Sequence, residues 1–283
     1  MIYAEVIGDP IAQSKSPVIH KFWLEQLGIA ADYRACQVTA EGLADYFAAR
    51  RSDPEWCGCN VTMPHKQAVM PLLDGLDPLA ARVGAVNTVV PGVDRLLRGF
   101  NTDVPGFLEP LQSLLAAPHL VRMARIFGAG GAARAIVAAL ADHGFTVVLA
   151  ARDPAKAREL LNELAPRGEH HTPPIDHFAQ STDFSFDDRT QLFDLVVNAS
   201  PLGMTGRPPL LLDLSHIPPG SVVYDIVTNP HETALLQAAG AAGFVTIDGL
   251  AMLIGQAAAA FELFFGQPAP RDHDAELRAK LTA

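Results

Sequence analysis

The sequence predicts an α/β protein of two domains. In the first hundred residues, apolar runs with strand character alternate with segments whose apolar residues recur at helical spacing. Residues 122–150 have the pattern strand, glycine-rich turn, Ala-rich helix, strand, which is typical of a parallel crossover. The 283 residues have a hydrophobic share of 49%, which is enough to bury two ordinary cores.

The N-terminal half begins with an apolar strand at residues 2–8, closed by the turn residues Gly8-Asp9-Pro10. The hydroxyl of Ser16 stands before Pro17, which predicts a capped helix over residues 17–27, because serine accepts from free amide groups and proline fits a first turn. Further strands are expected at residues 32–38, 58–62 and 85–90, and helices at residues 41–50 and 63–73.

The second half continues this alternation. A strand at residues 122–127 leads directly into a helix that ends near His143, and the next strand covers residues 146–150. Later strands are expected at residues 192–198, 221–226 and 244–247. After Gly249 an apolar helix runs to Phe265, long enough to pack against both halves. One domain is therefore expected at residues 1–104, completed by residues 246–283, and the other at residues 105–245.

Residues 167–188 are polar, contain proline and are rich in His and Asp, so we interpret them as a surface connection. The side chains of His170, His171 and His177 could bind a metal. A solvated loop explains them better, and the sequence predicts no metal site.

Composition excludes several classes of protein. The chain has 21 basic and 31 acidic residues, a net charge of −10, which argues against a surface that binds nucleic acid. Cys36, Cys57 and Cys59 form neither a disulfide framework nor a zinc cage. No apolar stretch reaches the length of a membrane span, and no leader is recognisable. We therefore expect a soluble, cytoplasmic protein, as a monomer or homodimer.

The glycine-rich turn at residues 128–133 is a variant of G-x-G-x-x-G/A. It follows a strand and opens a helix, where backbone N–H groups and the helix dipole can hold a pyrophosphate. This context predicts a Rossmann-like dinucleotide-binding domain. The residues expected to bind the cofactor here are Gly128, Ala129, Gly130, Gly131 and Ala132.

The choice of dinucleotide depends on the end of the second strand of this unit. Arg152, Lys156 and Arg158 could surround the 2′-phosphate of NADP(H) with charge-assisted hydrogen bonds. A carboxylate at this place would favour NAD, and Asp153 is present. However, Asp153 stands before Pro154 and a helical run, where a short carboxylate caps a helix. The sequence therefore favours NADP over NAD.

Six polar or glycine-rich motifs are spread over residues 14–256 in a fixed order. They are S-K-S-P (14–17), N-V-T-M-P-H-K (60–66), G-A-V-N-T (84–88), N-T-D (101–103), G-A-G-G-A-A-R (128–134) and G-L-A-M-L-I-G-Q (249–256). In these motifs the sequence resembles the shikimate dehydrogenase family over nearly its whole length.

The resemblance implies reduction of 3-dehydroshikimate to shikimate by NADPH, on the route to aromatic amino acids. It also implies a substrate domain and an NADP-binding domain with a cleft between them. A ketone that accepts hydride develops negative charge on oxygen, so a lysine ammonium can stabilise that oxygen and give it a proton. Lys66 and Asp103 are the expected catalytic pair, and which of the two is the net acid or base stays open.

Further site residues follow from the same resemblance. Ser14 and Ser16 are expected to hold the substrate carboxylate, and Thr62, Asn87 and Gln256 to meet the ring hydroxyls together with Asp103. Thr228 is expected to contact substrate, and Ile226, Gly249 and Met252 to border the nicotinamide.

This chain departs from the family pattern at three positions. Thr228 stands where tyrosine is usual, Ala251 where the motif commonly has glycine, and Val104 where glycine is frequent after N-T-D. Two alternatives therefore stay open. One is a quinate/shikimate dehydrogenase paralogue that uses NAD or NADP. The other is an NADP-binding sensor without catalysis, although a sensor would not need Lys66 together with Asp103.

Overall fold

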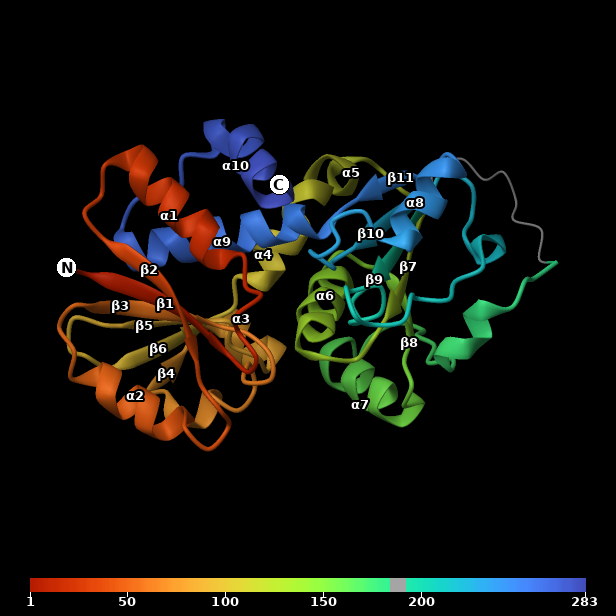
Figure 1. The fold of residues 1–283 in the computed structure, drawn as a ribbon. Helices are drawn as coiled ribbons and strands as arrows, with labels where there is room; N and C mark the ends of the chain where they lie inside the picture. The colour runs from red at the N-terminus through yellow and green to blue at the C-terminus, as the bar shows by residue number, and fades with distance from the viewer. Residues whose placement is uncertain (184–191) are drawn as a thin grey trace. The chain divides into compact units, whose positions relative to one another are not determined.

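Two sheets with helices packed on them form the protein, and each sheet belongs to a separate unit of the chain. The computed structural model describes residues 1–183 and 192–283 (Figure 1). Unit 1 comprises Met1–Gly106 and Ile254–Ala283, and unit 2 comprises Phe107–Leu253. The C-terminal segment therefore returns to the unit that contains the N-terminus.

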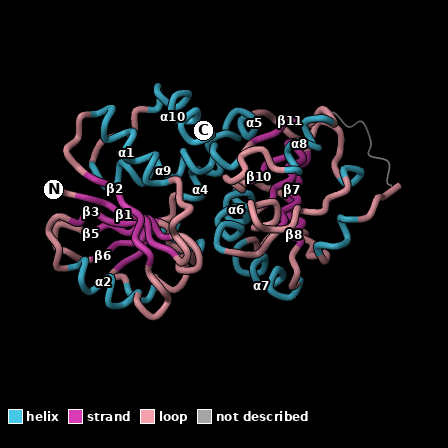
Figure 2. Tube along the Cα trace, in the orientation of Figure 1, coloured by secondary structure: helices cyan, strands magenta, loops and turns pink. Residues whose placement is uncertain are grey.

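Unit 1, all of whose residues are described, is built on a six-stranded mixed sheet of order β2-β1-β3-β5-β6-β4 (Figure 2). Strand β1 is parallel to β2 and β3, and β5 is antiparallel to β3 and β6. The strands are β1 (Tyr3–Gly8), β2 (Asp32–Gln37), β3 (Trp56–Val61), β4 (Gly75–Leu76), β5 (Thr88–Pro91) and β6 (Leu97–Phe100). The helices are α1 (Ser16–Leu27), α2 (Leu43–Arg51), η1 (Met70–Leu72), α3 (Pro78–Val83), η5 (Arg271–His273) and α10 (Asp274–Thr282), while α4 (Asp103–Leu108) and α9 (Gly249–Phe265) cross the boundary between units.

Strand β1 is buried along its whole length because both faces of this sheet are covered. Ala4 and Val6 belong to a hydrophobic cluster with residues of α9. Tyr3 and Ile7, which point to the other face, belong to a cluster with residues of α2. The apolar run read from the sequence is therefore a central strand between two helical layers.

Unit 2 contains, among its described residues, a five-stranded parallel sheet of order β11-β10-β9-β7-β8. Helix α6 connects β7 to the neighbouring parallel strand β8, as the crossover pattern predicts. The strands are β7 (Val121–Phe127), β8 (Thr146–Ala150), β9 (Leu192–Asn198), β10 (Val222–Asp225) and β11 (Val245–Ile247). The helices are η2 (Glu109–Leu111), α5 (Gln112–Ala116), α6 (Gly131–Asp142), α7 (Pro154–Leu164), η3 (Ile175–Ala179), η4 (Leu214–His216) and α8 (Ala234–Ala241). The predicted α/β class is confirmed.

The helix expected over residues 63–73 is wrong. This stretch is a series of turns that ends in η1. Pro71 has no amide hydrogen and would fall in the interior of that helix, where its ring would clash with the carbonyl four residues earlier; it stands instead in the first turn of η1. The apolar spacing of the stretch reflects turns packed on the sheet, where Val69 is fully buried.

The expected cap of α1 is also wrong. The helix begins at Ser16 itself, and Lys15 occupies the N-cap position without a side-chain cap. Ser14 Oγ accepts a hydrogen bond from the amide of Ser16, at 3.3 Å. Because the helix starts one residue earlier than expected, the hydroxyl of Ser16 lies in the first turn rather than before it.

Residues 167–188 do more than connect elements over the surface, although residues 184–188 lie outside the described part of the chain. The backbone of His171 exchanges hydrogen bonds with β8, from Leu149 N at 2.8 Å and to Val147 O at 3.0 Å. Strand β8 is at the edge of its sheet, so its outer backbone groups need partners.

Over residues 1–183 and 192–283, no helix is long and apolar enough to cross a membrane.

A fully buried histidine joins α1 to the sheet of unit 1. The ring of His20 stacks on that of Tyr33 in β2, with centroids 4.0 Å apart and planes within 2° of parallel. Burial lowers the pKa of His20 to about 3. In the unfolded chain a histidine titrates near 6.5, so acid protonates the unfolded form first.

We predict that His20 makes the free energy of unfolding fall by about 2 kcal/mol between about pH 7.5 and about pH 5. Because the folded-state pKa is depressed, the contribution is complete above about 6.5 and is lost as the pH falls toward 3. The variant His20→Phe keeps an aromatic ring and removes the titration. Urea unfolding at both pH values should give a correspondingly smaller pH dependence for the variant, and equal dependence in both proteins would contradict the assignment.

Candidate active site

Lys66 and Asp103, which lie 37 residues apart, form an ion pair in unit 1. The ammonium Nζ of Lys66 donates to Oδ2 of Asp103 at 2.6 Å. The side chains retain 14% and 6% of their exposure, so the pair is largely removed from water. A part-buried lysine ammonium next to a carboxylate puts a hydrogen-bond donor with a fixed position in a site of reduced dielectric, which suits acid–base chemistry.

Lys66 is held by its backbone and by the neighbouring side chain. It follows β3, in the series of turns that leads to η1. The amide of Val86 donates to the carbonyl of Lys66 at 2.7 Å. The buried ring of His65 contacts the carbonyl of Val38 through Nε2 at 2.6 Å. The main chain at Lys66 is therefore fixed on both sides.

Asp103 is the first residue of α4, and polar residues around it set its orientation. Asn101 Oδ1 accepts from the amide of Val104 at 3.2 Å, and Asn101 Nδ2 donates to the carbonyl of Ala85 at 2.9 Å. These contacts join the N-T-D motif to the G-A-V-N-T motif. Asn87 Nδ2 then donates to Asp103 Oδ1 at 3.0 Å, so both carboxylate oxygens of Asp103 have donors.

Helix α9 adds Gln256 to the same cluster. Asn87 Nδ2 and Gln256 Oε1 are 3.5 Å apart, at the limit of a hydrogen bond. Gly106 in α4 permits this approach, because a Cβ there would lie 2.5 Å from the backbone nitrogen of Gln256. The structure therefore brings together four residues that the sequence singles out, Lys66, Asn87, Asp103 and Gln256.

Ser14, Ser16 and Thr62 follow the carboxyl ends of neighbouring parallel strands, β1 and β3. Ligand sites of α/β sheets form at such ends. Ser16 is buried and Ser14 half-buried, and Thr62 is anchored by its amide, which donates to the carbonyl of Ile7 at 2.9 Å. The ammonium of Lys15, between the two serines, instead donates to the carbonyl of Leu281 in α10.

In unit 2, the glycine-rich turn is shaped for a ligand at the start of α6. Gly128 has φ +115°, and a Cβ there would lie 2.9 Å from the carbonyl oxygen of Ala199. Gly130 is the N-cap of α6, and nothing lies within 4 Å of a Cβ built on it. Ala129 lies between these two glycines, while Gly131 and Ala132 are the first helical residues. The turn therefore leaves open space before a twelve-residue helix whose first amides lack intrahelical partners.

The residues expected to recognise a 2′-phosphate surround the start of α7. Arg152 and Lys156 are exposed, and Arg158, also exposed, donates to the carbonyl of His170 at 3.2 Å. The carboxylate of Asp153 accepts from the amides of Ala155 at 3.0 Å and Lys156 at 3.2 Å, so its predicted cap is confirmed.

The residues expected to border the nicotinamide lie near β10 and the start of α9. A Cβ on Gly249 would lie 2.5 Å from the carbonyl oxygen of Ile226, so only glycine allows these two segments to touch. Met252 is buried and Thr228 half-buried. Thr228 belongs to unit 2 and the Lys66–Asp103 pair to unit 1, so its contact with substrate stays a prediction.

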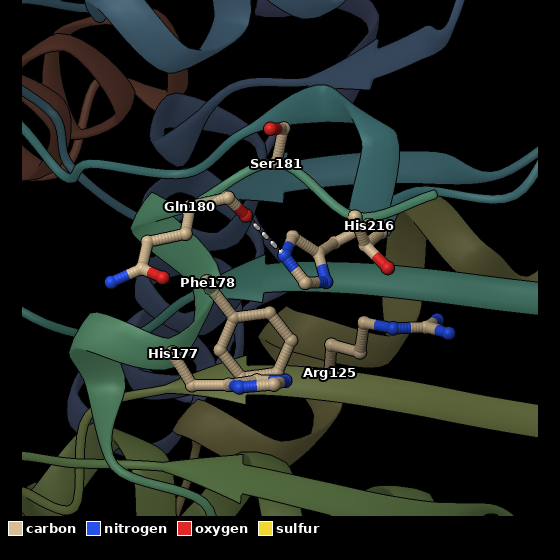
Figure 3. Close-up of a pocket in the computed structure, with 7 residues that line it drawn as sticks. Arg125, His177, Phe178, Gln180, Ser181 and His216 are labelled. Carbon is tan, nitrogen blue, oxygen red and sulfur yellow. Dashed lines mark hydrogen bonds between the residues drawn. The ribbon is translucent and has the colours of Figure 1, made fainter. Parts of the chain in front are cut away.

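A pocket elsewhere in unit 2 contains none of the predicted site residues (Figure 3). His216 Nε2 contacts the carbonyl of Gln180 there, at 2.7 Å. Arg125 is paired with Asp194, so its charge is already compensated. His177 lies in this pocket, but the described residues contain no group of three or more His, Cys, Asp or Glu side chains that could hold a metal. The pocket lining is Arg125, His177, Phe178, Gln180, Ser181, Thr182 and His216.

Two family models match parts of the chain. The shikimate dehydrogenase substrate binding domain matches residues 6–89, and the shikimate 5'-dehydrogenase C-terminal domain matches residues 249–276. A shikimate dehydrogenase (NADP(+)) of Sphingopyxis alaskensis is 51% identical over 284 residues, which cover 99% of this chain and 97% of the relative. The chain belongs to the shikimate dehydrogenase family.

Solved structures of related proteins have the same fold as this protein. Shikimate 5-dehydrogenase from Thermus thermophilus, in complex with NADP(H) and shikimate, is 34% identical with a TM-score of 0.81, over 99% of this chain and 100% of that chain. Quinate dehydrogenase from Corynebacterium glutamicum, in complex with NAD, is 32% identical with a TM-score of 0.83, over 99% of each chain.

Three buried residues of the polar cluster around Asn87 were missed by the sequence reasoning, although each stands inside a motif. Asn60, Thr88 and Thr102 are all at most 5% exposed. Asn87 Nδ2 donates to Thr102 Oγ1 at 2.9 Å, and Asn60 Nδ2 donates to Thr88 Oγ1 at 3.0 Å. For Asn60 in β3 and Thr88 in β5, the available signal was a polar side chain at a position where a strand should be apolar. Thr102 lies between β6 and α4, so its only signal was its place in the N-T-D motif.

Proposed function

We propose that this protein is an NADP-dependent shikimate dehydrogenase, which reversibly reduces 3-dehydroshikimate to shikimate in aromatic amino acid biosynthesis. The observation that carries the proposal is the buried Lys66–Asp103 pair, held by Asn87, in a chain 51% identical to a relative named shikimate dehydrogenase (NADP(+)). An NADP-binding sensor would need no such pair.

Lys66 and Asp103 are proposed as the proton-transfer pair. Bound NADPH supplies the hydride. The Lys66 ammonium stabilises the negative charge that grows on the ketone oxygen and gives that oxygen a proton, while Asp103 keeps the ammonium in position. In the reverse direction the same nitrogen takes the proton from the substrate hydroxyl.

Polar side chains of unit 1 are proposed to hold the substrate. The hydroxyls of Ser14 and Ser16, beside the start of α1, suit its carboxylate, because a helix N-terminus favours negative charge. Thr62, Asn87 and Gln256 suit the ring hydroxyls, and a substrate that lacked one would leave a buried group unpaired. In unit 2, Thr228 is proposed as a further substrate contact with a shorter reach than the usual tyrosine.

The residues of unit 2 suit NADP better than NAD. Gly128, Ala129, Gly130, Gly131 and Ala132 would receive the pyrophosphate at the open N-terminus of α6. Oδ1 of Asp153 accepts from two backbone amides at the start of α7, so the capping role explains this carboxylate without a ribose contact. Arg152 and Lys156 are exposed cations beside it and would bind a 2′-phosphate, with Arg158 one turn further. Ile226, Gly249 and Met252 would border the nicotinamide.

We also propose that the protein is located in the cytoplasm. Cys36, Cys57 and Cys59 are free thiols, which fits a reducing compartment such as the cytoplasm. We propose a monomer or homodimer.

The direct test combines the purified protein with NADPH or NADH and with 3-dehydroshikimate or 3-dehydroquinate, following loss of the nicotinamide absorbance. NADPH with 3-dehydroshikimate should give the highest kcat/KM. A higher value with 3-dehydroquinate and NADH would favour the quinate dehydrogenase alternative, for which the Corynebacterium glutamicum neighbour is the precedent. Binding of NADP without turnover of either substrate would favour the sensor.

Replacing the proposed proton donor should separate chemistry from nucleotide binding. In Lys66→Ala, kcat should fall by about 10²-fold to 10⁴-fold, the usual contribution of a positioned acid or base, with the Kd for NADP near the wild-type value. The control is Lys21→Ala, whose surface ion pair with Asp32 should be dispensable. Equal losses of turnover and of nucleotide affinity in Lys66→Ala would assign Lys66 a structural role.

A substitution in the glycine-rich turn should weaken nucleotide binding, whereas Lys66→Ala should leave it unchanged. A methyl group in Gly130→Ala would meet open space in the free protein but would stand in the path of the pyrophosphate. We expect a Kd for NADPH raised by about tenfold or more, with a melting temperature within about 2 °C of wild type. The control is Gly240→Ala in α8, where a Cβ also meets open space. It should neither raise the Kd for NADPH nor lower the melting temperature. Unchanged NADPH affinity in Gly130→Ala would argue against this binding place.

A further inference from the structure

Tyr33 is a buried polar residue to which the proposed reaction gives no part. Its hydroxyl donates to Oδ1 of Asn60 at 2.6 Å, and its ring is held flat against that of His20. Burial raises the pKa of the Tyr33 hydroxyl well above its usual value, although a hydrogen bond with the side chain of Ser16 acts in the opposite direction, so the group stays a hydrogen-bond donor at neutral pH. A fixed donor therefore faces one end of the Asn60 amide.

Tyr33 determines which way the amide of Asn60 points. Because Oδ1 accepts from the tyrosine, Nδ2 is turned to the opposite side. There it donates to Thr88 Oγ1 at 3.0 Å and to the carbonyl of Asn87 at 3.3 Å. If the amide were reversed, Asn60 Oδ1 would face Thr88 Oγ1 and the carbonyl oxygen of Asn87. The hydroxyl of Tyr33 would then face the amino group Nδ2.

The orientation of Asn60 is passed on through Thr88. Since Thr88 Oγ1 accepts from Asn60, its own hydrogen is free for Asn87 Oδ1, at 3.2 Å. The amide of Thr102 donates to the same Oδ1 at 2.7 Å. With two donors on its oxygen, Asn87 must present Nδ2 to Asp103, where it contacts Oδ1 at 3.0 Å.

We propose that Tyr33 is a positioning residue for the reaction, and that it acts through Asn60 and Thr88 on the amide of Asn87 and so on the carboxylate of Asp103. The inference rests on the proposed function for its kinetic consequence. We call this series of hydrogen-bonded side chains the buried relay; its members are Tyr33, Asn60, Thr88, Asn87 and Asp103. Tyr33 itself touches neither member of the catalytic pair through any of these contacts; it holds the amide that does.

The first test is Tyr33→Phe, which keeps the stacked ring and removes the donor. The kcat/KM for shikimate should fall about fivefold, the scale of one net hydrogen bond, with the KM for NADP unchanged. The matched control is Tyr46→Phe. The Tyr46 hydroxyl is also buried and donates to Glu5 Oε2 at 2.8 Å, but on the opposite face of the sheet. Tyr46→Phe should lose stability without losing kcat/KM.

The second test asks whether Tyr33 acts through Asn87. In an Asn87→Ala background, Tyr33→Phe should change kcat/KM by less than about twofold, because the amide it orients is gone. The same fivefold loss in both backgrounds would overturn the proposal, as would wild-type kcat/KM in Tyr33→Phe. Thr88→Val interrupts the buried relay between Asn60 and Asn87 and should lower kcat/KM at least as much as Tyr33→Phe. This variant tests the proposal if Tyr33→Phe does not fold.

A third measurement does not depend on turnover. In protein labelled with ¹⁵N at asparagine, the side-chain amide resonances of Asn87 can be assigned by their absence from Asn87→Ala. They should shift in Tyr33→Phe and in Thr88→Val, and stay in place in Tyr46→Phe. Resonances of Asn87 that are unmoved in Tyr33→Phe would overturn the buried relay even if the kinetics changed. An inactive wild-type protein would overturn the proposed function, while these spectra would still test the buried relay.

Discussion

The ion pair between Lys66 and Asp103 is the interaction on which the rest of the site depends. Removing two opposite charges from water costs more free energy than their attraction returns unless further hydrogen bonds satisfy them. Here Asp103 Oδ1 accepts from Asn87 while Oδ2 accepts from Lys66. A polar cluster of this kind is kept where chemistry requires it, because an apolar pair would serve folding equally well.

The fold of unit 1 explains how motifs so far apart in the sequence converge. Strands β1 and β3 are parallel neighbours, so the segments that follow them, with Ser14, Ser16 and Thr62, start from one edge of the sheet. The C-terminal segment then returns, and α9 brings Gln256 to Asn87. Gly106 lets α4 approach the backbone of α9 at Gln256, and Gly249 lets the start of α9 approach the backbone at Ile226. The scattered motifs are therefore the points at which distant segments meet.

Strong local patterns could be predicted from the sequence. The turn between β7 and α6 and the cap at Asp153 depend on residues within one turn of each other, and both are as expected. The helix over residues 63–73 and the cap at Ser16 were wrong because apolar spacing and a single hydroxyl were weighed without the prolines and the exact helix start. Apolar spacing alone cannot tell a helix from turns packed on a sheet, and it cannot fix a helix start to one residue.

Contacts between distant residues were predicted only where chemistry demanded them. The pairing of Lys66 with Asp103 was expected from the resemblance to the shikimate dehydrogenase family and agrees with what a ketone reduction needs. Tyr33 and Asn60 are 27 positions apart, and no pattern in the segment between them would join them. Asn60, Thr88 and Thr102 stood inside recognised motifs, but their hydrogen-bond partners depend on strand register. Register is a property of the folded sheet, so their connections required the structure.

The central claim is that Lys66 and Asp103 meet the reacting group of the substrate. It is tested most directly by a crystal structure of this protein with shikimate and NADP⁺ bound. The account predicts that Lys66 Nζ lies within hydrogen-bond distance, about 3 Å, of the hydroxyl oxygen that is oxidised, with Asp103 still paired to it. A substrate bound with that hydroxyl more than about 5 Å from both side chains would contradict it.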